Sequence, residues 1–157
     1  AMLMNRLRLQ PGQAFFMPAG NLHAYLQGTG LEVMSNSDNV LRGGLTPKHI
    51  DVDELAQVVD FMPGVPPLVS PTQVTPGVLR YPTPAPEFAL YQVQEATDQP
   101  LPASGSARIL LVVDGTAVLA SDTDELAVGR GGAAFVGADE DIRIDCPGRA
   151  FVAAAGS

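Results

Sequence analysis

The sequence predicts a mainly β protein with one short helix, and three observations support this prediction. Short runs of alternating or apolar residues recur along the chain, and turn residues separate them. The 157 residues include 16 Gly and 14 Pro, which exceeds average usage and implies many turns. Only residues 52–61 carry apolar side chains at helical spacing.

The size and charge of the chain limit the classes of function open to it. A length of 157 residues fits one ordinary domain or two very small ones. The formal net charge of −8 repels phosphate backbones and anionic lipid headgroups. No apolar run approaches the roughly 20 residues that a membrane-spanning helix needs. We therefore expect a soluble protein with neither nucleic-acid nor membrane partners.

The cysteine content and the N-terminal sequence predict a cytoplasmic protein. The single cysteine, Cys146, cannot form an internal disulfide. The chain also begins without the basic and apolar stretches of a secretory signal.

Short strands are expected in the first third of the chain, over residues 5–9, 14–17, 22–26 and 31–34. In residues 22–26 the period of two places His23 and Tyr25 on one face and three apolar side chains on the other. The turn Gly28-Thr29-Gly30 separates this strand from the next. The polar face with His23 is the one that could carry chemistry.

A helix and an extended connector are expected next. Asp51 and Glu54 have the form of a capping box, and the apolar residues that follow predict a helix over residues 52–61. Eight prolines lie between Pro63 and Pro86. Their missing amide protons and fixed φ angles discourage both helix and central strand. This stretch is therefore interpreted as a connector.

The second half returns to short strands, expected over residues 88–93, 108–113, 116–120, 133–136, 142–146 and 149–154. Turn signals between them include Asp114-Gly115, Gly131-Gly132 and Pro147-Gly148, at intervals that suit a sandwich or small barrel. The predicted organisation is a first part over residues 1–61, a Pro-rich connector over 62–86 and a β-domain over 87–157.

A histidine motif lies in the first part of the chain. Gly12, Pro18, Gly20 and His23 fit the pattern G-x5-P-x-G-x2-H, the second of two motifs that mark cupin β-barrels. The glycine and the turn at residues 18–21 bend the chain so that His23 points into a barrel, where a neutral imidazole can bind a metal. A lone histidine is more often a hydrogen-bonded barrel side chain, but the four spaced positions favour a ligand.

A longer set of residues is more specific: MPAGNLHAY at 17–25, EVM at 32–34, SDNVLR at 37–42 and GLTPKH at 44–49. It closely resembles type I mannose-6-phosphate isomerase over residues 5–61. In that family PAGNxHAY is followed by SDNVxRxGxTPK, and the chain meets every fixed position. Beyond Phe61 the resemblance is architectural, because family members end in a second, smaller β-barrel.

The resemblance implies a zinc-dependent aldose–ketose isomerase that interconverts mannose 6-phosphate and fructose 6-phosphate through an enediol. It implies a cupin-type (jelly-roll) fold, in which residues 1–61 end the catalytic barrel and residues 87–157 form the small C-terminal barrel. His23 matches the last zinc ligand of the family. Arg42 matches the active-site arginine, whose fixed charge could stabilise an enediolate.

Four further positions match the signature as substrate-binding candidates: Tyr25 and Glu32 at site-lining positions, and Asp38 and Lys48 with less defined roles. Structural alternatives remain open for all four. Tyr25 could simply pack in the barrel mouth, and Glu32 and Asp38 could pair with Arg42 in a structural cluster. Lys48 taken alone would be a solvated surface residue.

The zinc site that the resemblance implies is incomplete in this chain. The other family ligands, a Gln-x-His pair and a Glu, precede the matching segment, and neither His49 nor Cys146 can replace them. A catalytic zinc usually has three protein ligands. We therefore expect the C-terminal portion of an isomerase, inactive without an N-terminal part. The alternative is a free-standing cupin-like module that binds a sugar phosphate without catalysis.

The second barrel is not expected to hold a metal. If Gly132 is aligned with the first glycine of the motif, the same spacing places Ala138, Glu140 and Arg143 at the Pro, Gly and His positions. The metal-binding histidine is thus absent, and this barrel is interpreted as structural.

Overall fold

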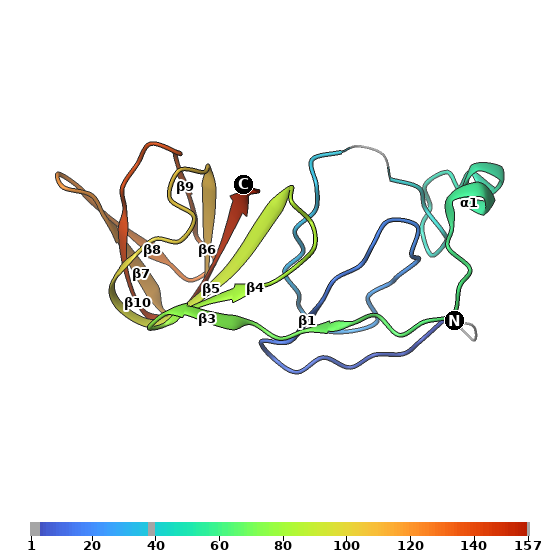
Figure 1. Cartoon of the computed structure of the whole chain (residues 1–157), viewed down its shortest axis with the longest axis horizontal. Coiled ribbons are helices and arrows are strands. Elements are labelled where there is room, and N and C mark those ends of the chain that lie inside the picture. The colour runs from blue at the N-terminus through green and yellow to red at the C-terminus, as the bar shows by residue number, and fades with distance from the viewer. Residues whose placement is uncertain (1–3, 38–39, 157) are drawn as a thin grey trace.

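The structure, a computed structural model, describes residues 4–37 and 40–156. Figure 1 shows an elongated molecule with a large sheet at one end and α1 (Val52–Val58) at the other. Between them, β1 (Ala14–Phe15) pairs with β2 (Leu68–Val69) in a two-stranded ladder. The mainly β fold with a short helix is confirmed.

The large sheet contains eight antiparallel strands in the order β3-β4-β5-β10-β6-β9, with β7 paired to β10 and β8 paired to β7. They are β3 (Thr72–Thr75), β4 (Val78–Tyr81), β5 (Phe88–Pro100), β6 (Arg108–Asp114), β7 (Thr116–Ala120), β8 (Glu125–Gly129), β9 (Ala133–Val136) and β10 (Arg143–Ala155). β10 pairs with β5 along its length, with β7 in its first part and with β6 in its second. A register shift between Cys146 and Arg149 interrupts the β10 pairing at Pro147-Gly148, which the sequence indicates as a turn.

The core of the large sheet follows the two-residue period of its strands. In β6, Leu110 and Val112 are fully buried, whereas Ile109, which precedes Leu110 and points to the other face, is exposed. Ile144 and Val152 from β10 are fully buried in the same cluster. Cys146 is buried there too, and burial raises the pKa of its thiol. The thiol is therefore protonated and unreactive near neutral pH.

The strands expected in the second half are present, with three differences. β5 continues to Pro100, the expected strands 142–146 and 149–154 are one strand, and β8 was not expected. Glu95 and Asp98, with φ of 48° and 47°, lie at two register shifts in β5. Beyond each shift the pairing with β10 resumes, so the strand continues. β8 shows little alternation, since only Val128 among its residues is buried.

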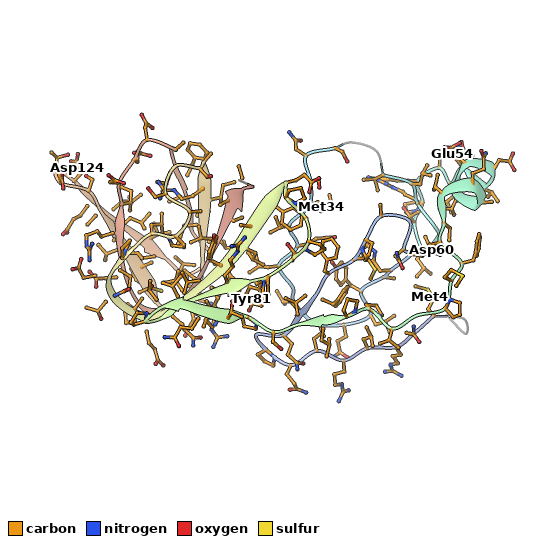
Figure 2. All side chains as sticks on the ribbon, viewed as in Figure 1. Met4, Met34, Glu54, Asp60, Tyr81 and Asp124 are labelled. Carbon is orange, nitrogen blue, oxygen red and sulfur yellow. The ribbon has the colours of Figure 1, made fainter. Side chains whose placement is uncertain are left out.

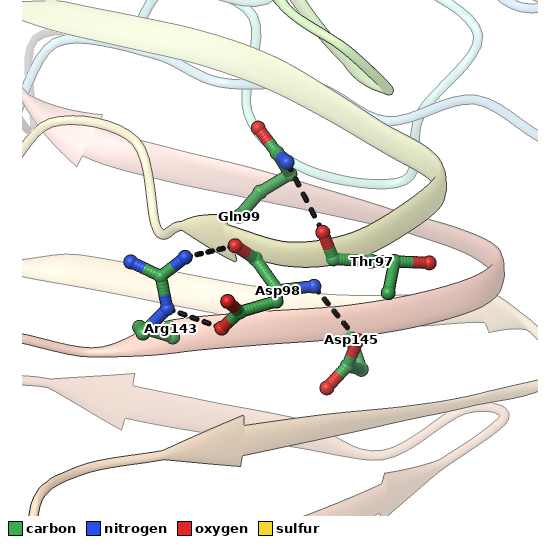
Figure 3. Close-up of polar contacts among 5 residues, drawn as sticks. All are labelled: Thr97, Asp98, Gln99, Arg143 and Asp145. Atoms are coloured by element: carbon green, nitrogen blue, oxygen red, sulfur yellow. Dashed lines mark hydrogen bonds and ion pairs between the residues drawn. The ribbon is translucent and has the colours of Figure 1, made fainter.

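A polar cluster on β5 and β10 surrounds Asp98 (Figure 3). The Asp98 amide donates to the Asp145 carboxylate at 2.8 Å, and the Arg143 guanidinium donates to the carboxylate and backbone oxygen of Asp98. The hydrogen bond from Arg143 lowers the pKa of the Asp98 carboxyl. Arg143 thus holds an exposed β-bulge.

The Pro-rich stretch is more ordered than an extended connector. β2, β3 and β4 occupy its Pro-free intervals, and β3 and β4 join the large sheet. Pro76 and Gly77 form the turn between them, with Gly77 at φ +76°. Proline favours the first and glycine the second central position of such a turn. The expectation that this stretch has no central strand was wrong, because the prolines flank β4, which lies between β3 and β5; the proposed division into domains stays a prediction.

Three expected strands of the first part do not form ladders. Residues 5–9, 22–26 and 31–34 have no strand partner among the described residues, and only two residues of 14–17 pair, as β1. An isolated strand leaves its N–H and C=O groups unpaired, so alternation alone does not stabilise it. These strand predictions were wrong in this structure.

The helix begins where the capping box predicted it, but it ends at Val58 and not at the expected residue 61. The Asp51 carboxylate accepts a hydrogen bond from the Glu54 amide at 3.0 Å, as an N-cap does. α1 ends at Val58 because Val59 has extended backbone angles and the Asp60 amide donates to Gly20 instead. Within the described residues, no helix has the length and apolarity that crossing a membrane requires.

Candidate functional site

The turn at residues 18–21 directs the chain into the candidate site. Gly20 has φ +81°, a left-handed conformation that glycine adopts without strain. The Asn21 side-chain amide lies 3.4 Å from the carbonyl oxygens of both Pro18 and Ala19. This local network fixes the direction in which the chain reaches His23.

The end of α1 packs directly against this turn. The Asp60 amide donates to the Gly20 carbonyl at 2.9 Å, and a Cβ at Gly20 would lie 2.8 Å from the Val58 carbonyl oxygen. Figure 2 places Asp60 between α1 and the neighbouring loops. Only glycine therefore permits both the backbone angle and the close approach of the helix.

His23, Glu32 and Tyr25 form a side-chain cluster. The His23 Nε2 and Glu32 Oε1 atoms are 3.7 Å apart, because the chain bends at Gln27-Gly28 and brings the two segments together. The His23 and Tyr25 rings meet edge to face with centroids 6.0 Å apart, as the two-residue period predicts. Partial desolvation, and then the charge and hydrogen bond of Glu32, raise the pKa of the Tyr25 phenol.

Arg42 lies on a segment that contacts the segment of His23 through their neighbours. Its side chain is half-buried. A Cβ on Gly43 would lie 2.6 Å from Leu22 Cδ2, so the residues beside Arg42 and His23 are in close contact. Leu22 and Leu41 also line one cavity of about 250 Å³ against α1. The segments that carry His23 and Arg42 therefore both lie beside α1.

The structure does not bring every candidate into this cluster. Within the described residues Glu32 pairs with His23, and no ion pair joins it to Arg42, so the structural pairing considered for these two is not found. Lys48 is exposed, and its amide donates to the Thr46 hydroxyl at 3.2 Å. His49 is exposed as well. Asp38 lies outside the described residues.

The donors present do not complete a zinc site. Among residues 4–37 and 40–156, no group of three or more His, Cys, Asp or Glu side chains is arranged to hold a metal ion. His23 and Glu32 supply an imidazole and a carboxylate, which are suitable zinc ligands in kind but too few. These two side chains alone do not make a metal site.

We expect the isolated 157-residue chain to bind zinc weakly or not at all, because one imidazole cannot replace a full ligand set. Isothermal titration with zinc chloride should show no tight site, and His23→Ala should change little. One tight site that survives Cys146→Ala but disappears in His23→Ala would contradict this expectation.

Sequence comparison connects this arrangement to known enzymes, although no family model matches the chain. Mannose-6-phosphate isomerase of Salmonella typhimurium is 45% identical over 140 residues, which are 88% of this chain and 36% of that enzyme. The human enzyme of the same name is 37% identical over 150 residues, 90% of this chain and 36% of that enzyme. The chain is similar to the C-terminal part of mannose-6-phosphate isomerases.

A solved structure supports the same relationship. Salmonella typhimurium mannose-6-phosphate isomerase bound to fructose 6-phosphate and zinc matches with a TM-score of 0.68 and 38% identity, over 79% of this chain and 32% of that one. The likeness confirms the cupin-type fold. The chain spans about a third of the length of the mannose-6-phosphate isomerases it matches.

Proposed function

We propose that this chain is the C-terminal portion of a zinc-dependent isomerase that interconverts mannose 6-phosphate and fructose 6-phosphate. The main support is 45% identity to the Salmonella typhimurium mannose-6-phosphate isomerase over nearly the whole chain. The related solved structure holds both fructose 6-phosphate and zinc. Conversion between these sugars is an internal redox reaction of the substrate, and we also propose that the protein acts in the cytoplasm.

In this proposal His23 is one zinc ligand and Glu32 lines the site beside it. Crystallised alanine variants of the Salmonella typhimurium enzyme replace a histidine and a glutamate nine positions apart in that chain. His23 and Glu32 have the same separation and lie 3.7 Å apart. Zinc would supply electrophilic polarisation of the sugar oxygens, and its remaining ligands belong to sequence outside these residues.

The reaction moves a proton between C1 and C2 of the sugar through an enediol, which requires stabilisation of developing negative charge. Arg42 is our candidate for that task, because its guanidinium is always charged and its half-burial reduces screening by water. Tyr25 is the candidate hydrogen-bond donor to the sugar, since the raised pKa of its phenol keeps the proton in place. Asp38 and Lys48 stay proposals as substrate-binding residues.

The first part of the chain has the surface expected of an incomplete barrel. Several large apolar side chains are strongly exposed there: Leu26, Leu45, Phe61 and Met62, at 75%, 95%, 77% and 80%. Exposed apolar groups that gather on one part of a protein mark interaction sites. We propose that the N-terminal part of the isomerase covers this region and completes the barrel and the zinc site.

The decisive experiment uses the complete reading frame that contains this chain. If it encodes an upstream Gln-x-His and Glu, the purified product should convert mannose 6-phosphate to fructose 6-phosphate, lose activity on chelation and regain it with zinc. A complete product that has those ligands and bound zinc but no isomerase activity would overturn the proposal. A reading frame without them, whose product binds sugar phosphate without turnover, would establish the free-standing module.

Lys48 is expected to affect substrate binding more than turnover. If its ammonium meets the substrate phosphate, Lys48→Ala should raise KM about tenfold and leave kcat nearly unchanged, because the phosphate charge is the same in ground and transition states. Steady-state kinetics with mannose 6-phosphate measures both constants. A normal KM would return Lys48 to the role of a solvated surface residue.

A further inference from the structure

A buried hydrogen-bond network joins the large sheet to the first part of the chain. Tyr81 on β4 is 5% exposed, and its hydroxyl lies 3.0 Å from the Gly12 carbonyl oxygen and 2.9 Å from Gln92 Oε1. Gln92, on the neighbouring β5, is 4% exposed, and its amide nitrogen lies 2.6 Å from Gln94 Oε1. Figure 2 shows Tyr81 where the large sheet meets the N-terminal part.

The Tyr81 hydroxyl has two possible acceptors within hydrogen-bond distance. A phenol has one proton, so Tyr81 cannot donate to both the Gly12 carbonyl and the Gln92 side-chain oxygen. The two ends of a glutamine amide are nearly the same size and are assigned from their hydrogen bonds. If both glutamine amides are turned by 180°, Gln94 donates to Gln92, Gln92 donates to Tyr81, and Tyr81 donates to Gly12. The Gly12 carbonyl, the Tyr81 hydroxyl and the Gln92 side-chain oxygen then each have a partner.

We propose that Tyr81 is a positioning residue. Its hydroxyl donates to the Gly12 carbonyl, and this bond anchors the segment that leads into the candidate site to the large sheet. Gly12 stands at a turn with φ +86°, and one residue separates it from β1. β1 pairs with β2, and the chain then enters the turn that carries His23. The Tyr81 network and the β1–β2 ladder thus hold this segment at two points.

The chemistry of Tyr81 suits a permanent donor. Burial raises the pKa of its phenol, and the nearby positive charge of Arg149 opposes this only in part. The phenol therefore keeps its proton at neutral pH. A carbonyl at a turn has no helix or sheet partner of its own, so loss of the donor leaves the partly buried Gly12 oxygen without this partner, which is costly.

Tyr81→Phe tests the anchor, with Tyr91→Phe as the matched control. Tyr91 is a buried tyrosine on β5 whose hydroxyl is outside this network. In the 157-residue chain, Tyr81→Phe should accelerate amide hydrogen exchange at Gln13, Ala14 and Phe15 about five- to tenfold. Exchange in β6 and β10 should stay unchanged, and Tyr91→Phe should not produce the local effect. Equal acceleration everywhere, or none at Gln13, would overturn the proposal.

A second variant tests the direction of the network without removing the phenol. Gln92→Glu, studied at a pH at which its carboxyl is ionised, supplies an acceptor that cannot donate, so the Tyr81 proton should turn to the carboxylate and leave Gly12 unpaired. The local acceleration at Gln13–Phe15 should reappear. Unchanged exchange there would mean that Tyr81 never donated to Gly12, and the proposal would fail.

The expected effect of Tyr81→Phe on enzyme kinetics rests on the proposed function. In the complete isomerase, Tyr81→Phe should lower kcat about three- to tenfold with KM within twofold of normal, because the sugar-phosphate contacts are retained while the segment before His23 loosens. Normal kcat despite faster exchange would overturn the positioning role. An inactive unmodified enzyme would instead count against the proposed function, and the exchange experiment would still decide on the anchor.

Discussion

Arg42→Ala is expected to lower kcat of the complete isomerase about a hundredfold or more, with a much smaller change in KM. The proposed partner of its guanidinium is negative charge that develops only as the enediolate forms, so the lost interaction belongs to the transition state. Steady-state kinetics with mannose 6-phosphate, and with fructose 6-phosphate for the reverse direction, would measure the split between the two constants.

Two further variants make the Arg42 result specific. Arg130→Ala removes an exposed arginine beyond β8 in the large sheet and should leave the kinetics unchanged. Arg42→Lys keeps a positive charge but loses the planar fork of donors, so its activity should fall between that of alanine and arginine. Near-normal kcat in Arg42→Ala would remove Arg42 from catalysis and leave it a structural residue.

The site was predictable from sequence where local periodicity controls it. The alternation over residues 22–26 predicts His23 and Tyr25 on one side, and their rings do meet. The proximity of Glu32 depends on the bend at Gln27-Gly28, which the glycine-rich turn indicated only in outline. The contact between the segments that carry Arg42 and His23 comes from Leu22 against Gly43, a tertiary contact with no local pattern.

The fold shows the same division between local and long-range information. The capping box and the two-residue period identified α1 and most of the large sheet, because both signals act within a few residues. The strand predictions for the first part failed because a strand requires a partner strand, and its own sequence does not show whether one is present. The Tyr81 contact with Gly12 spans 69 positions, and no spacing rule predicts it.

The turn between β3 and β4 provides the largest expected effect on stability. Gly77 has φ +76°, and a Cβ there would lie 2.6 Å from the Gln94 carbonyl oxygen and 3.0 Å from Ala96. Its own carbonyl accepts from the Gln94 amide at 2.8 Å. The obstructing atoms belong largely to the β5 backbone, which is held by pairing with β10 and cannot move away easily.

Gly77→Ala should therefore reduce the free energy of unfolding by about 3 kcal/mol, combining backbone strain with an overpacked contact. Gly105→Ala is the matched control, because Gly105 has φ +84° but nothing within 4 Å of a Cβ. It should cost only about 1 kcal/mol, from strain alone. Urea unfolding followed by circular dichroism of the sheet measures both losses, and their difference isolates the close approach of β5. Equal losses in the two variants would mean that β5 yields to the added methyl group, and that glycine is needed at position 77 for its backbone angle only.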